Sequence, residues 1–252
     1  MGKSNQSTQE INSQAQNPLG TAPVGGLIAK FAIPAIISML VSAMYNIVDQ
    51  IFIGQGVGML GNAATNVAFP VTTIATALAL LLGIGGASNY NLEMGAGGIA
   101  GTALSSLVIS GLILAVIALV FLKPLLTLFG ATTDVMPYAV AYTGITALGL
   151  PFYILSVGGN HVVRADRSPT YSMTCIMIGA IINTILDPVF IFVFGWGIKG
   201  AAWATVIGQV VSGVLVIVYF WKFRNMYLTG AMLKPKMPYL KAIISLGLAS
   251  CI

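Results

Sequence analysis

Six long apolar stretches, separated by short segments that carry most of the charged residues, dominate the pattern along the chain. Each stretch is long enough to cross the roughly 30 Å hydrocarbon layer of a membrane as a helix of about 20 residues. The apolar residues are continuous rather than alternating, which favours helices over the strands of a membrane barrel. The pattern therefore predicts an all-α integral membrane protein with spans at residues 27–53, 66–87, 99–122, 136–160, 170–194 and 201–220.

The two ends of the chain do not follow this pattern. Residues 1–26 are polar, rich in Gln, Asn and Ser, and predict a disordered cytoplasmic tail without a cleavable signal peptide. A seventh apolar stretch begins near Tyr239 and stops at Ile252, after about a dozen apolar residues, which is short of a span. We expect residues 27–225 to form the transmembrane lobe and residues 226–252 to hold a linker and the truncated start of a seventh helix. On this interpretation the chain is a fragment of something longer.

The composition agrees with a membrane location, because 57% of residues are hydrophobic and only 7% are charged. Soluble domains carry about 25% charged residues, so this chain has too few to cover a water-facing surface. The net charge of +5 does not indicate a nucleic-acid partner, since the basic residues lie between apolar runs, beside lipid headgroups. No His or Cys cluster has the spacing of a zinc site.

The positions of Lys and Arg predict the orientation, because these residues accumulate on the cytoplasmic side of a membrane. With the N-terminus inside, nine basic residues fall on the cytoplasmic side and only Lys123 and Lys199 fall outside. The nine are Lys3, Lys30, Arg164, Arg167, Lys222, Arg224, Lys234, Lys236 and Lys241. We therefore expect a multi-pass protein of the cytoplasmic membrane. Bends are expected at the prolines within its spans, because each removes a backbone donor: Pro34, Pro70, Pro151 and Pro188.

Two carboxylates, Asp49 and Asp187, lie within otherwise apolar spans. Each costs about 2.5–3.5 kcal/mol at the centre of a membrane helix, so each is expected to face a cavity or a partner. Asp49 is 19 residues past Lys30 and Asp187 is 20 past Arg167, about 29 and 30 Å at helical rise, so their depths agree. The alternative for Asp187 is that it merely terminates a helix before Pro188. The alternative for Asp49 is a place in interfacial water.

Two further polar residues are expected near Asp187. Asn183 lies one helical turn away on the same face, and its carbonyl oxygen suits a hard cation. Thr205 lies at a similar depth on the next span. Three helices can thus converge on one polar site. A solitary His161 at the end of a span is better interpreted as an interfacial residue than as a proton relay.

Several segments in combination resemble the multidrug and toxic compound extrusion (MATE) family over about residues 27–225. The segments are Ile33-Pro34, residues 46–54 (Asn-Ile-Val-Asp-Gln-Ile-Phe-Ile-Gly), residues 160–165, residues 183–188 and residues 200–205 (Gly-Ala-Ala-Trp-Ala-Thr). The resemblance implies twelve helices in two six-helix lobes that export organic cations and other drugs in exchange for sodium ions or protons. This chain would supply the first lobe, with a missing C-terminal lobe or a second copy as its partner.

The resemblance also assigns residues. It implies an ion or proton site at Asp49, Asn183, Asp187 and Thr205, of which the first three would be the main ligands of a sodium ion. It places Tyr45, Tyr142 and Asn160 on the substrate cavity. No cofactor is implied besides the coupling ion, sodium or proton. One departure concerns the loop after the fourth span, where the family commonly has Gly at the position of Arg167.

Two other functional classes fit the residues less well. A lipid-linked oligosaccharide flippase of related architecture would need a cationic cavity, and the spans contain almost no Lys or Arg. A membrane-embedded hydrolase would need a nucleophile and base, and the single His and missing zinc motif argue against an enzyme. The sequence thus favours a secondary transporter for drug-like molecules and leaves the coupling ion open.

Overall fold

The computed structural model describes residues 24–92, 97–221 and 235–251, and nearly all of these residues are helical. The helices are α3 (Val24–Gly56), α4 (Met59–Leu92), α5 (Gly97–Val120), α6 (Leu122–Leu128), α7 (Met136–Ala165), α8 (Pro169–Pro188), the π-helix η1 (Val189–Val193), α9 (Ile198–Trp221) and α10 (Met237–Cys251). Residues 1–23 of the predicted tail and residues 226–234 of the predicted linker lie outside the described ranges.

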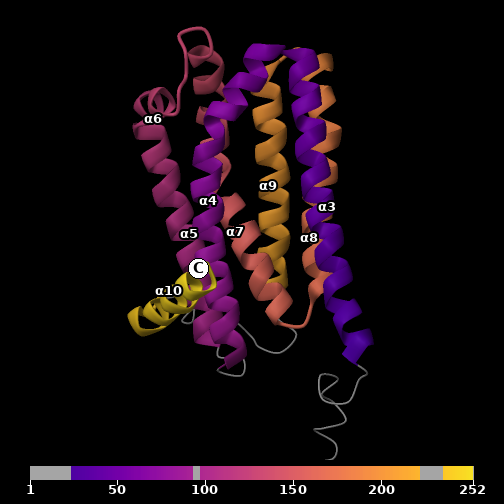
Figure 1. Cartoon of the computed structure of the whole chain (residues 1–252), viewed down its shortest axis with the longest axis vertical. Helices are drawn as coiled ribbons and strands as arrows, with labels where there is room; N and C mark the ends of the chain where they lie inside the picture. Colours follow the sequence, from indigo (N-terminus) through magenta and orange to yellow (C-terminus); the bar gives the residue numbers. More distant parts are fainter. Residues whose placement is uncertain (1–23, 93–96, 222–234, 252) are drawn as a thin grey trace, which may run out of the picture.

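Six of these helices are long and apolar enough to cross a membrane, which confirms the predicted all-α six-helix bundle. They run alternately up and down, side by side (Figure 1). The end at which α7 finishes and α8 begins carries Arg164 and Arg167, and we call it the basic end. The opposite end, at which η1 leads into α9, is called the far end.

The second span is longer than its apolar run suggested. It begins at Met59 rather than residue 66, directly after Gly58, whose φ of 87° ends the preceding helix. The seven added residues, about two helical turns, include polar side chains that have partners inside the bundle: the Thr65 hydroxyl donates to the Gln50 side-chain oxygen over 3.0 Å. Because these polar residues interrupt the apolar pattern, the predicted start of the second span was too late in the sequence.

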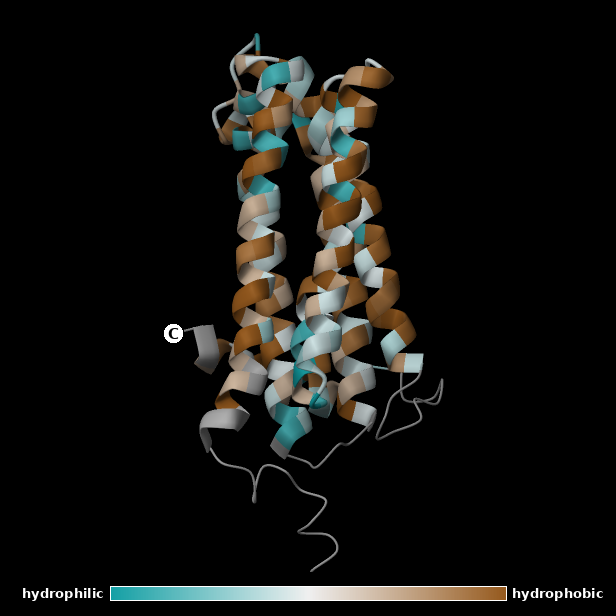
Figure 2. Cartoon of the chain, turned by 90° about the vertical axis from the view of Figure 1, so that its right-hand side faces the viewer, coloured by the Kyte–Doolittle hydropathy of each residue, from teal (hydrophilic) through white to brown (hydrophobic). Residues whose placement is uncertain are grey.

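The surface of the bundle is apolar along the middle of its length. Figure 2 shows brown, hydrophobic residues along the helices and teal, hydrophilic ones mostly near the two ends. Large apolar side chains are widely exposed, for example Met39, Val120 and Trp221. In lipid such exposure has no cost, because hydrocarbon tails are as apolar as the side chains.

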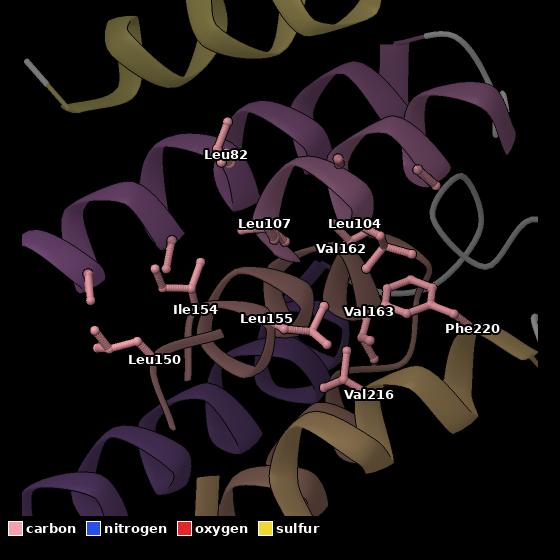
Figure 3. Close-up of a cluster of buried hydrophobic side chains, with 14 of the residues drawn as sticks. Leu82, Leu104, Leu107, Leu150, Ile154, Leu155, Val162, Val163, Val216 and Phe220 are labelled. Carbon is pink, nitrogen blue, oxygen red and sulfur yellow. The ribbon is translucent and has the colours of Figure 1, made fainter. Parts of the chain in front are cut away.

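The main core surrounds α7, which packs against α4, α5 and α9. Figure 3 shows part of it: Leu82 from α4, Leu107 from α5 and Ile154 from α7 gather in one apolar cluster. Small residues let the helices approach closely, as expected where van der Waals packing replaces the hydrophobic effect. A Cβ atom placed on Gly83 would lie 2.6 Å from the Gly158 Cα, so α4 and α7 touch backbone to backbone.

A hydrogen-bonded network joins the helices at the basic end. Asp166, which is buried, accepts hydrogen bonds from the hydroxyls of Tyr90 on α4 (2.8 Å) and Tyr219 on α9 (2.6 Å). The Tyr219 hydroxyl also lies 2.8 Å from the Ser168 hydroxyl. The short loop between α7 and α8 is thereby tied to both neighbouring helices.

Arg167 in this loop adopts a left-handed backbone conformation with a φ of 59°, and it is the only described residue other than glycine with a positive φ. Its side chain is exposed. A residue other than glycine at this position places a Cβ atom in an unfavourable region.

Two further features concern the prolines and the last helix. Pro188 ends α8, and the five residues after it form a π-helix instead of continuing the α-helical pattern. Helix α10 crosses the side of the bundle near the basic end (Figure 1) and packs on α4, where a Cβ on Gly247 would meet the Leu81 carbonyl oxygen. The apolar stretch near Tyr239 is thus helical.

We expect Gly83→Ala to destabilise the bundle by about 1–3 kcal/mol, because the new methyl group must separate α4 from α7. Thermal unfolding of the purified chain in detergent measures this loss of stability. The matched control is Gly144→Ala, whose Cβ would find its nearest atom 3.7 Å away on Leu122. That variant should be neutral or gain up to about 1 kcal/mol from helix propensity. Equal melting temperatures for both variants would contradict the close packing.

We expect Arg167→Gly to be more stable than Arg167→Ala by about 1 kcal/mol, because glycine adopts a positive φ without the Cβ penalty. Both variants lose the same exposed side chain, so their comparison isolates the backbone term. The measurement is again thermal unfolding in detergent. An Ala variant as stable as the Gly variant would show that the turn is not strained.

Candidate functional site

The carboxyl groups of Asp49 on α3 and Asp187 on α8 lie within hydrogen-bonding range of each other inside the bundle. Asp49 is 7% exposed and Asp187 is fully buried. One oxygen of each, Asp49 Oδ1 and Asp187 Oδ2, is buried without a hydrogen-bond partner. Asp49 therefore lies inside the bundle rather than in interfacial water, and Asp187, which precedes the last residue of α8, lies within reach of it.

The other predicted ligands lie against this pair. The Asn183 amide nitrogen lies 3.5 Å from Asp187 Oδ1 and 3.5 Å from the Thr205 hydroxyl of α9. The amide oxygen of Asn183 is itself buried and has no partner. Helices α3, α8 and α9 thus bring Asp49, Asn183, Asp187 and Thr205 together, and they present oxygen atoms that lack donors.

Two tyrosines border the same cluster. The Tyr142 hydroxyl of α7 is hydrogen-bonded to Thr205, and Tyr45 of α3 lies one helical turn from Asp49. Both rings are close enough to interact electrostatically with the two carboxyl groups. The cluster is therefore enclosed by side chains from four helices.

A cavity of about 440 Å³ leads from this cluster toward the basic end, a size typical of small-molecule sites. Tyr45, Asn183 and Thr205 line its far part, whereas His161 and Arg164 line the part near the basic end. The predicted Asn160 lies between them, and its amide oxygen is buried without a partner. The cavity meets the cluster at Asn183 and Thr205, whereas Asp49, Asp187 and Tyr142 lie behind them and are not among the residues that line it.

The charges of the site are unbalanced. In the part of the chain that the structure describes, neither Asp49 nor Asp187 forms an ion pair with a basic side chain. No group of three or more His, Cys, Asp or Glu that suits a metal ion is present among the described residues. The donor set of two carboxylates with neutral oxygens therefore fits a monovalent cation or a shared proton better than a transition metal.

Sequence reasoning missed several polar residues of the cavity and of the carboxylate cluster. Gln209 lines it with a buried, unpartnered side-chain oxygen, and the hydroxyls of Ser156 and Ser212 meet over 2.6 Å. Gln50 hydrogen-bonds to Asp49. Helical spacing could have revealed Gln209, which follows Thr205 by one turn on the same face of α9.

Comparisons with known proteins agree with this architecture. The sequence profile of the MatE family matches residues 34–189. The chain is 30% identical over 196 residues to the multidrug export protein MepA of Staphylococcus haemolyticus, covering 75% of this chain and 43% of that protein. It is 31% identical over 215 residues to an FAD transporter of Shewanella oneidensis, covering 79% of this chain and 47% of that protein. The chain thus spans about half the length of these relatives.

Solved structures show the same fold. A structure of the MATE multidrug transporter DinF-BH is 34% identical, with a TM-score of 0.85 over 92% of this chain and 53% of that one. A MATE protein in a bent conformation is 28% identical, with a TM-score of 0.80 over 88% of this chain and 51% of that one. The six-helix bundle therefore corresponds to one lobe of such a protein. The chain belongs to the MatE family of multidrug and toxic compound extrusion proteins, which are membrane transporters and not enzymes.

Proposed function

We propose that this chain is the ion-binding lobe of an antiporter that exports drugs and other small organic molecules from the cell. The observation that carries the proposal is the pair of facing carboxyl groups, Asp49 and Asp187, without a basic partner among the described residues. The proposed partner is a second lobe or a second copy of this chain. The basic end would face the cytoplasm, as the distribution of Lys and Arg supports.

The coupling ion would be held by Asp49, Asn183, Asp187 and Thr205. Two ionised carboxylates at close range in a medium of low dielectric repel each other strongly. A proton shared between them, or a sodium ion bound to their free oxygens, removes that repulsion. The buried, unpartnered oxygens of Asp49, Asn183 and Asp187 support this role, because a cation would supply the partner that each lacks.

Exchange would follow from the effect of the ion on the spacing of α3 and α8. With the ion bound, the carboxylates can stay together, and without it their repulsion favours a conformation in which α3 moves away. Pro34, within α3, is the point at which this helix can bend. A substrate in the cavity lined by Tyr45 and Asn160 would favour the ion-free conformation, so drug and ion would shift the population in opposite directions.

We expect Asp49→Asn and Asp187→Asn each to reduce ion-driven dye export by about tenfold or more, because coupling free energies of 1–3 kcal/mol correspond to about 5–150-fold. Uptake of a cationic dye into everted vesicles containing the full-length protein measures this. The matched control is Asp134→Asn, which removes an exposed carboxylate at the far end and should keep wild-type export. Wild-type export by both buried variants would exclude the proposed site.

Thr205→Val distinguishes the two coupling ions. A sodium ion needs the hydroxyl oxygen as a ligand, so this variant should need about tenfold more sodium for half-maximal export, and Thr205→Ser should restore the wild-type value. A proton needs only the carboxylates, so export driven by a pH gradient should change less than about twofold. Vesicles energised separately with a sodium gradient and with a pH gradient supply the two measurements. Export driven by neither gradient in the wild type would reject ion coupling.

A further inference from the structure

The basic end of the cavity contains a positive charge that has no carboxylate partner among the described residues. The Nε atom of Arg164, on the last turn of α7, donates to the hydroxyl of the buried Ser172 over 3.0 Å, which holds the guanidinium against the start of α8. Among the described residues, the terminal nitrogens of Arg164 have no hydrogen-bond acceptor. Arg164 and His161 both line the cavity, so this end presents free donors to its interior.

The nearest acidic residue in sequence does not neutralise this charge. Asp166 uses its two oxygens to accept hydrogen bonds from Tyr90 and Tyr219, on the side of α4 and α9. Apart from His161 and Arg164, the side chains that line the cavity are polar or apolar and uncharged. A guanidinium with two free terminal nitrogens is suited to bidentate binding of a carboxylate or phosphate.

The two ends of the cavity therefore have opposite character. Ser172, which holds Arg164, and Asn183, which lies at the carboxylate cluster, are eleven residues apart on α8, about 17 Å at helical rise. Apolar side chains such as Leu80, Val157 and Ile176 line the wall between the ends. The cavity thus combines a cationic end, an apolar wall and an end rich in unpartnered oxygens.

We propose that the cavity binds amphoteric organic molecules, with a carboxylate or phosphate of the substrate on Arg164 and its cationic group directed toward the carboxylate cluster. This inference rests on the proposed export function and specifies its substrate class. A purely cationic drug would use only half of the site. It would also leave the terminal donors of Arg164 without an acceptor from the substrate.

The test is a binding measurement with two probes that differ by one group: a small rhodamine with unsubstituted amino groups as the free carboxylic acid, and its methyl ester. Fluorescence anisotropy on the purified full-length protein in uncharged detergent gives both affinities. We expect the wild type to bind the acid about tenfold more tightly than the ester, because a charge-assisted bidentate pair forms only with the acid. Equal or weaker binding of the acid by the wild type would overturn the proposal without any variant.

Substitutions locate the selectivity. In Arg164→Gln the ratio of acid to ester affinity should fall about tenfold, and in Arg164→Lys it should fall less, since the charge remains but the fork of donors is lost. Ser172→Ala, which releases the guanidinium, should give an intermediate ratio. The control is Lys199→Gln, which removes an exposed positive charge at the far end and should keep the wild-type ratio. An unchanged ratio in Arg164→Gln would overturn the proposal.

Two outcomes separate this inference from the proposed function. Ion-driven export with no dependence of selectivity on Arg164 would refute the anion subsite and leave the antiporter. Selectivity that depends on Arg164, in a protein that no ion gradient drives, would refute the antiporter and leave the subsite. Displacement of the acid by soluble short-chain phosphatidylglycerol, with no displacement by a soluble aromatic carboxylate, would assign Arg164 to a lipid headgroup and overturn the inference.

Discussion

Repulsion between two carboxyl groups in an apolar bundle is the constraint on which the rest of this structure depends. Asp49 and Asp187 face each other, and no basic residue among the described ones offsets their charge. The groups around the pair are neutral: the Asn183 amide nitrogen lies 3.5 Å from Asp187 Oδ1, Gln50 hydrogen-bonds to Asp49, and buried oxygens of Asp49, Asn183 and Asp187 keep no partner. A proton or a small cation would offset this repulsion, so under the proposed function the ion state of the site and the packing of α3 on α8 would be coupled.

The packing of the bundle is uneven in a way that suits this coupling. Helix α7 is enclosed by α4, α5 and α9 and contacts α4 through backbone atoms at Gly83 and Gly158, which leaves it little freedom to move. Helix α3 packs mainly on α8, and only 17% of its span is buried within the described bundle. A change of charge at Asp49 therefore acts on the helix that is held least by its neighbours, while the frame around α7 stays fixed.

Much of this architecture could be predicted from the sequence, because the membrane leaves few choices. Each long apolar run must form a helix, and a carboxylate within one must find a partner, which predicted both the bundle and the meeting of Asp49 with Asp187. The exceptions are polar residues whose partners are distant in sequence. Asp166 lies in a short loop, yet it is buried and accepts hydrogen bonds from Tyr90 and Tyr219, which are 76 and 53 residues away in sequence. Periodicity contains no information about such pairs.

The tyrosine pair around Asp166 also affects the charge at the basic end of the cavity. Arg164 and Asp166 are two residues apart, and in an isolated loop their opposite charges would attract each other. Tyr90 and Tyr219 instead fix the carboxylate on the α4 and α9 side, while Ser172 fixes the guanidinium at the start of α8. The charges are thereby separated by hydrogen bonds to three different helices. Arg164 keeps its terminal donors for the cavity because Asp166 is satisfied elsewhere, so a network that joins the helices at the basic end also sets the charge of the binding site.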